Sequence, residues 1–234
     1  MRKLGILVAA LLAVAAWTAP GQALPVIELW EYAVNINGTV SNPTSGDPIP
    51  GSVGLGGFNT TTGLGTMTVT VTGAGSHYVS LFVDHDINVL ANGWLDETGI
   101  VNGAAPAGLS WEIGLYSGAP NIYDHFAAGT LANANGIWPE DVAMALGQSF
   151  VLAAGDTAVI SFTVGTAAPA GFSLQQTDPG FTDADPNNSA DPGEIYISAG
   201  LNITPGGGPT VPEPATLLLL GSGLAGLVFL RKRG

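Results

Sequence analysis

All five basic residues of this 234-residue chain lie at its two ends. Arg2 and Lys3 precede one apolar segment, and Arg231, Lys232 and Arg233 follow another. The interval between them holds all 18 Asp and Glu residues and no Lys or Arg, so its fold must form without salt bridges to Lys or Arg. A body of this charge repels phosphate groups and attracts divalent cations. We therefore predict no nucleic-acid partner.

The N-terminal apolar segment is typical of a secretion signal. Arg2 and Lys3 form a charged start, residues 4–17 are apolar, and Gly21 and Ala23 place small residues before a cleavage point. An uncleaved membrane anchor is the alternative, but the apolar run is short for a bilayer. We predict a signal peptide over residues 1–23.

The C-terminal region has three parts in a fixed order. Residues 205–211 form a flexible Gly/Pro linker, two prolines then bracket a glutamate, and residues 215–230 form an apolar segment. A helix over that segment is about 24 Å long, a little shorter than a hydrocarbon core of about 30 Å. The basic cluster behind it marks the cytoplasmic side. We predict a transmembrane helix over residues 215–230, with the acidic body outside the cytoplasm.

This order of parts resembles the PEP-CTERM sorting signal. The residues that carry the resemblance are Val211, Pro212, Glu213, Pro214, Ala215 and Thr216, and then the basic cluster Arg231, Lys232 and Arg233. The resemblance implies a sorting signal over residues 212–234 of a protein exported by a Gram-negative bacterium. It implies processing by exosortase, a membrane-embedded cysteine transpeptidase. The protein would pass through the inner membrane transiently and reach the cell surface or a polysaccharide-rich biofilm matrix.

The central region has the pattern of an all-β domain. It has no cysteine, so disulfides and Cys-ligated zinc are excluded and a hydrophobic core must hold the fold. Short apolar alternations recur between Gly and Pro turn signals, which predicts an acidic β-sandwich ectodomain over residues 24–204 with one or two short helices. We predict strands over residues 26–36, 65–72, 77–83, 110–116, 149–153, 158–164, 172–176 and 194–203.

Two segments of this region favour a helix. Residues 139–147 begin with proline and two acidic residues and end with glycine, the order found in short helices. Residues 121–131 predict a second helix, with Ile122, Phe126 and Leu131 facing the core. Residues 37–63 are rich in Gly, Pro, Ser and Thr and predict a long surface loop.

The sharpest candidate site is an acidic stretch that ends at Glu194. Oxygen-bearing side chains fall at the ligand positions of an EF-hand calcium loop, namely Asp183, Asp185, Asn187, Ser189, Asp191 and Glu194. No helices flank this stretch in our prediction, and an ordinary solvated turn uses the same residue types. Calcium is thus the one cofactor that the sequence raises, and a plain turn is the alternative.

A second acidic group follows the strand predicted over residues 77–83. Asp84, Asp86 and Asn88 are candidate metal ligands, and Asp96 or Glu97 would complete the shell. Their spacing does not fit a calcium loop, so we favour an acidic turn at the end of a strand.

Two further patterns favour structural roles. The histidines His77, His85 and His125 have a spacing that matches no zinc motif. Residues 66–72 alternate threonine with Met and Val, which on a strand places the threonines on one face. A threonine ladder can bind ice or polysaccharide, but more often it is the solvent face of a half-buried strand.

No catalytic constellation stands out in the sequence. There is no G-x-S-x-G elbow, no phosphate-loop lysine and no cysteine nucleophile. We expect a non-enzymatic surface or matrix protein. The alternatives are a calcium-dependent carbohydrate-binding module and an extracellular glycosidase that uses two carboxylates.

Overall fold

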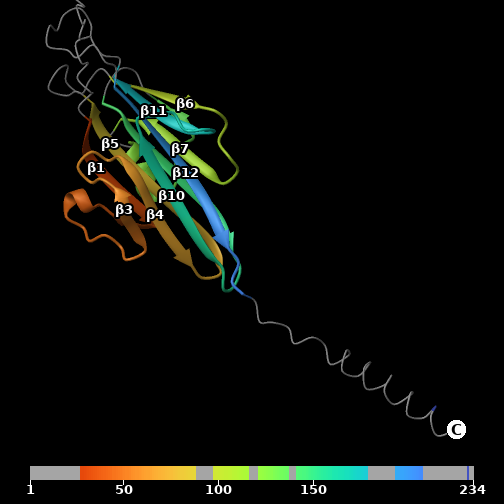
Figure 1. The fold of residues 1–234 in the computed structure, drawn as a ribbon. Coiled ribbons are helices and arrows are strands. Elements are labelled where there is room, and N and C mark those ends of the chain that lie inside the picture. The colour runs from red at the N-terminus through yellow and green to blue at the C-terminus, as the bar shows by residue number, and fades with distance from the viewer. Residues whose placement is uncertain are drawn as a thin grey trace, which may run out of the picture.

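The computed structural model describes residues 27–87, 97–115, 121–136, 141–178, 193–207 and 231. These residues form two six-stranded sheets that pack face to face (Figure 1). Every strand pairing within them is antiparallel except the short contact between β7 (Leu109–Gly114) and β8 (Ala134–Asn135). The predicted all-β class is confirmed.

Each sheet mixes strands from distant parts of the chain. The first sheet has the order β2-β1-β5-β9-β7-β8. Besides β7 and β8 it contains β1 (Ile27–Ile36), β2 (Thr39–Ser41), β5 (Gly75–Ile87) and β9 (Ala143–Leu152). The second sheet has the order β3-β4-β10-β12-β11-β6, formed by β3 (Val53–Phe58), β4 (Gly65–Thr72), β6 (Thr98–Asn102), β10 (Thr157–Gly165), β11 (Ser173–Asp178) and β12 (Gly193–Thr204).

Side-chain alternation along the strands builds one core between the sheets. On β4, Met67 and Val69 are fully buried while the threonines between them face away from the core. β5 and β10 contribute further buried apolar side chains to the same cluster, among them Leu81 and Phe162. The alternation predicted for residues 66–72 therefore matches the buried face of β4, and the strand predicted over residues 158–164 is confirmed as part of β10.

A short helix, α2 (Ile122–Ala128), covers part of the outer face of the first sheet. Asn121 caps its N-terminus and forms a reciprocal capping box with Asp124. Ile122 and Phe126 are buried in a second, smaller cluster against Phe82 of β5. The helix predicted over residues 121–131 is confirmed at its core, and it ends where Gly129 adopts a left-handed conformation.

The helix predicted over residues 139–147 is wrong. Residues 143–147 form the first half of β9, between β5 and β7. Met144 and Leu146 enter the main core, while Ala143 and Ala145 lie beneath α2. Burial on both faces of a central strand outweighs the helical preference of this Ala-rich segment.

The prediction of a long surface loop over residues 37–63 is also wrong in part. The segment contains β2, β3 and a 3-10 turn over Pro43–Ser45, and Phe58 is buried. Val53 and Leu55 alternate with glycine and pack against the core. The sequence analysis likewise did not predict β6 and β8.

Several predicted segments lie outside the described residues. These are the signal peptide, the apolar segment over residues 215–230, and almost all of the Pro-Glu-Pro region and basic tail. Within the part of the chain that the structure describes, no helix has the length and apolarity needed to cross a membrane.

Candidate functional site

Acidic side chains gather at one end of the sandwich, which we call the acidic pole. β5 and β11 end there, and β6, β9 and β12 begin there (Figure 1). The strands and their extensions carry Glu28, Glu31, Asp84, Asp86, Glu97, Asp141, Asp178 and Glu194 into this region. In the described turns of the opposite end, where β12 finishes, the one acidic residue is Asp156. The sandwich is therefore strongly polarised in charge.

A β-bulge in β1 places two glutamates opposite two aspartates. The register pairs Glu28 with Asp86 and Glu31 with Asp84, and it shifts by one residue at Trp30. Residues three apart on a regular strand point to opposite faces, but the extra residue returns Glu31 to the face of Glu28. Two pairs of like charges therefore face each other on the outer surface of the first sheet.

Asp84 is the most deeply buried member of this group. Its side chain is 2% exposed, and its Oδ1 atom has no hydrogen-bond partner. Burial, reinforced first by the charge of Asp141 and then by Asp86, raises the pKa of Asp84 to about 9. Burial and the charge of Glu28 also raise the pKa of Asp86.

Glu31 connects this group to the surface. The Asn42 amide Nδ2 donates a hydrogen bond to Glu31 Oε1 and a second one, at 3.2 Å, to the Tyr123 hydroxyl. Glu31 is buried, yet it lines a surface hollow of about 420 Å³ together with Trp30, Thr44 and Ser45. One glutamate oxygen is thus positioned by Asn42, and the side chain adjoins an opening to solvent.

Glu97 joins the two sheets at the acidic pole. Its Oε1 accepts a hydrogen bond from the Ile87 backbone at 3.0 Å, and its Oε2 accepts one from the Val142 backbone at 3.3 Å. Gln176 Nε2 on β11 donates to the same Oε2 at 2.6 Å. Burial raises the pKa of Glu97 to about 8, although these hydrogen bonds act in the opposite direction. The arrangement identifies Glu97 as a structural link.

The outer face of the second sheet carries one carboxylate on β4, β10 and β12, that of Glu194 at the start of β12, and the rows beyond it are uncharged. The register aligns four rows of three residues, each exposed or half-buried, which we call the threonine face: Thr66, Thr68, Thr70 and Thr72 of β4; Thr157, Val159, Ser161 and Thr163 of β10; Ser198, Gly200, Asn202 and Thr204 of β12. Neighbouring hydroxyls meet across the strands, as between Thr66 and Thr163 at 3.1 Å. The predicted alternation on β4 is confirmed, and the face extends well beyond that strand.

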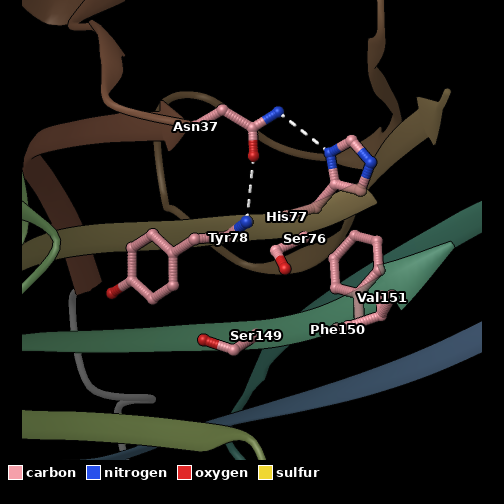
Figure 2. A pocket seen from close by; sticks show the side chains of 7 residues that line it. All are labelled: Asn37, Ser76, His77, Tyr78, Ser149, Phe150 and Val151. Carbon is pink, nitrogen blue, oxygen red and sulfur yellow. Dashed lines mark hydrogen bonds between the residues drawn. The ribbon is translucent and has the colours of Figure 1, made fainter. Parts of the chain in front are cut away.

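A surface hollow of about 560 Å³ lies over β5 and β9 near the end away from the acidic pole (Figure 2). The His77 ring stacks on Phe150 at 5.5 Å between ring centroids. His77 Nδ1 lies 3.2 Å from Asn37 Nδ2, and its Nε2 lies 2.9 Å from the Gly73 carbonyl. Asn37 also accepts a hydrogen bond from the Tyr78 backbone. These bonds use one ring nitrogen on the β1–β2 turn at Asn37 and the other on the β4–β5 turn at Gly73, so His77 is not placed as a catalytic base.

The three histidines occupy separate positions. Burial lowers the pKa of His85 to about 4, which keeps its ring neutral against Gly63. His125 on α2 pairs with Glu112 on β7 at 2.8 Å. Among the described residues, no three His, Cys, Asp or Glu side chains converge as a ready-made metal site. The structural role favoured for the histidines is consistent with this arrangement.

The remaining predicted site residues are mostly outside the described residues. The sorting motif and the candidate calcium loop fall there, except for Arg231 and Glu194. Glu194 accepts a hydrogen bond from the Tyr196 hydroxyl at 2.7 Å. Asp84 and Asp86 lie within β5, which continues to Ile87, so the acidic turn predicted at the end of that strand is wrong for these two residues. The structure places Glu28 and Glu31, which the sequence analysis did not select, opposite them. Only the β1–β5 pairing, which sequence does not reveal, relates them.

One comparison with known proteins bears on the C-terminus. Residues 210–233 match the family model described as the PEP-CTERM protein-sorting motif, as the sequence resemblance implied. No curated protein and no solved structure matches the chain. The motif implies export across the membrane to the cell surface or extracellular space, with exosortase as the processing partner.

Proposed function

We propose that this protein, sorted by its PEP-CTERM motif, is a non-enzymatic component of the cell surface or of a polysaccharide matrix. The observation that carries the proposal is the connection between the sandwich and the motif. β12 ends at Thr204, and the matched motif begins at residue 210, so only a short linker separates them. The sandwich is therefore attached to the sorting motif through the end at which β12 finishes.

This connection orients the acidic pole away from the membrane or anchoring point. β12 runs from the acidic pole at Gly193 to the tethered end at Thr204, a distance of about 40 Å at about 3.3 Å per residue. The negative charge of the distal end favours solubility and limits association between neighbouring copies. An extracellular display protein benefits from both properties.

The threonine face is the surface that we assign to matrix contact. It offers rows of hydroxyl groups, which both donate and accept, so the hydroxyls of a neutral polysaccharide can form hydrogen bonds there. Its position on β4, β10 and β12 leaves it uncovered by α2, which packs on the other sheet. Ser161 lies on its central strand, where Ser161→Arg is expected to weaken retention on a neutral polysaccharide column.

Processing of the full chain tests the sorting part of the proposal. In a host with exosortase, the wild-type chain is expected in the extracellular fraction at reduced mass. Glu213→Ala within the motif should keep the full-length chain in the membrane fraction. Pro209→Ala, just outside the matched residues, is the control and should be processed normally. Equal release of the Glu213→Ala variant, or a wild-type chain that stays full-length in the cytosol, would refute the proposal.

A further inference from the structure

We propose that Glu31 and Asp84, assisted by Asp86, bind a divalent cation of the calcium type at the acidic pole. This inference concerns the sandwich itself and goes beyond the proposed sorting and display. It starts from the cross-strand pairing at the β1 bulge, which sets Glu31 opposite Asp84 and Glu28 opposite Asp86.

Like charges directly opposite each other on adjacent strands are destabilising. Proteins usually relieve such repulsion with a nearby Lys or Arg, but the chain has neither between positions 4 and 230. Asp141 adds a further negative charge close to Asp84. The raised pKa of Asp84 indicates that a proton relieves this repulsion at neutral pH, and a bound cation would displace that proton and supply the positive charge instead.

The burial of Asp84 gives independent support. Buried polar atoms in folded proteins are nearly always hydrogen-bonded. Asp84 is 2% exposed, and its Oδ1 has no donor within reach. An unpartnered carboxylate oxygen beside other carboxylates has the chemistry of a calcium ligand.

The surrounding chemistry favours a hard cation. The candidate ligand atoms are carboxylate oxygens, and Thr44 and Ser45 are polar residues that line the hollow beside Glu31. Calcium takes six to eight oxygen ligands in flexible geometry, including waters, whereas magnesium demands a near-ideal octahedron. The hollow beside Glu31 provides both an entry path and space for water ligands.

Among the described residues no three His, Cys, Asp or Glu side chains converge on one point, so Asp86 acts here through its charge and not as a third ligand. We infer that Glu31 and Asp84 supply the direct ligands and that waters complete the coordination shell. Partly hydrated sites of this kind bind weakly, and extracellular calcium modules have dissociation constants of about 10⁻⁴–10⁻³ M. We expect an affinity in that range.

The test uses the full-length chain, purified in detergent and stripped with EDTA. Calcium is titrated while the melting temperature is measured, and terbium luminescence provides a second signal because Trp30 adjoins Glu31 in the bulge. Wild-type protein should melt several degrees higher at saturating calcium. Asp84→Asn should weaken calcium binding by about tenfold or more and should still fold, since it removes a buried charge. Glu31→Gln should weaken it similarly.

Two matched variants separate this site from other acidic groups. Asp156→Asn removes one charge at the opposite end and should leave the calcium response unchanged. The double variant Asp183→Asn with Asp185→Asn disables the candidate loop and should also leave it unchanged. The proposal is overturned if wild-type protein shows no calcium response, if Asp84→Asn and Glu31→Gln respond like wild type, or if only the loop variant loses the response. None of these results would affect the sorting experiment, which reads processing alone.

Discussion

Replacement of Glu97 by glutamine is expected to change the pH dependence of stability. Glu97 is fully buried and accepts hydrogen bonds from Ile87, Val142 and Gln176. Glutamine keeps the shape but presents an NH₂ group in place of one acceptor oxygen, so at least one donor loses its partner. A buried donor without an acceptor costs about 1–3 kcal/mol. At low pH, Glu97→Gln should lower the free energy of unfolding by about that amount.

The difference in the free energy of unfolding between Glu97→Gln and wild type changes sign as the pH rises. Burial raises the pKa of Glu97 from its ordinary value of 4.5 to about 8. Between these two values the folded state binds more protons than the unfolded state, so the free energy of unfolding falls with increasing pH. The slope is about 1.4 kcal/mol per pH unit, and the total loss is about 5 kcal/mol. Glutamine does not titrate, so the variant lacks this loss. The two stability curves should therefore cross between about pH 5 and pH 7.

Urea denaturation of the full-length chain from pH 5 to pH 8.5, followed by tryptophan fluorescence, measures both curves. EDTA is included so that bound cations do not contribute. Asp156→Asn makes the same carboxylate-to-amide change at the other end of the sandwich, where Asp156 accepts hydrogen bonds from the Ala153 and Gly206 backbones, and its difference from wild type should stay constant with pH over this range. If the difference between Glu97→Gln and wild type is constant over this pH range, the assignment of a buried, proton-binding Glu97 is refuted.

Three further substitutions test the fold. Gly65→Ala should lower the melting temperature by several degrees in scanning calorimetry. Gly65 has a φ of +112°, and an added Cβ would lie 1.8 Å from the Gly57 carbonyl oxygen. The control is Gly165→Ala, because a Cβ at Gly165 meets nothing within 4 Å. Asn35→Ala should cost about 2–3 kcal/mol in urea denaturation, because the buried Asn35 amide donates to two carbonyls at the end of α2. Faster hydrogen exchange across α2 should accompany it, and unchanged exchange would contradict this role. Asn121→Ala removes the N-cap of α2 and should cost about 1 kcal/mol in thermal unfolding followed by circular dichroism.

Local patterns predicted much of the architecture. Short apolar alternation predicted strands over residues 65–72 and 158–164, and on residues 66–72 it also predicted the two faces, because side chains on a strand point to alternate sides whatever its neighbours are. The spacing of Ile122, Phe126 and Leu131 predicted the helix at α2, whereas the terminal residues of 139–147 predicted a helix that the structure does not contain. The charged ends and the Pro-Glu-Pro motif predicted the sorting signal, since such signals are read as linear sequence.

Other features depended on contacts between distant segments. Residues 143–147 have helical propensity, but they complete a sheet between β5 and β7 and are buried on both faces. The threonine face requires β4, β10 and β12 to be neighbours, and sequence shows only one strand of it at a time.

The acidic pole shows most clearly which features follow from the sequence alone and which depend on tertiary structure. The sequence by itself determined that no Lys or Arg accompanies the acidic residues of the body, because composition does not depend on folding. Only the tertiary structure decided that Glu31 faces Asp84, because a single extra residue at Trp30 changes which side of β1 each glutamate occupies. Strand register is a property of two segments together, so neither segment alone can specify it.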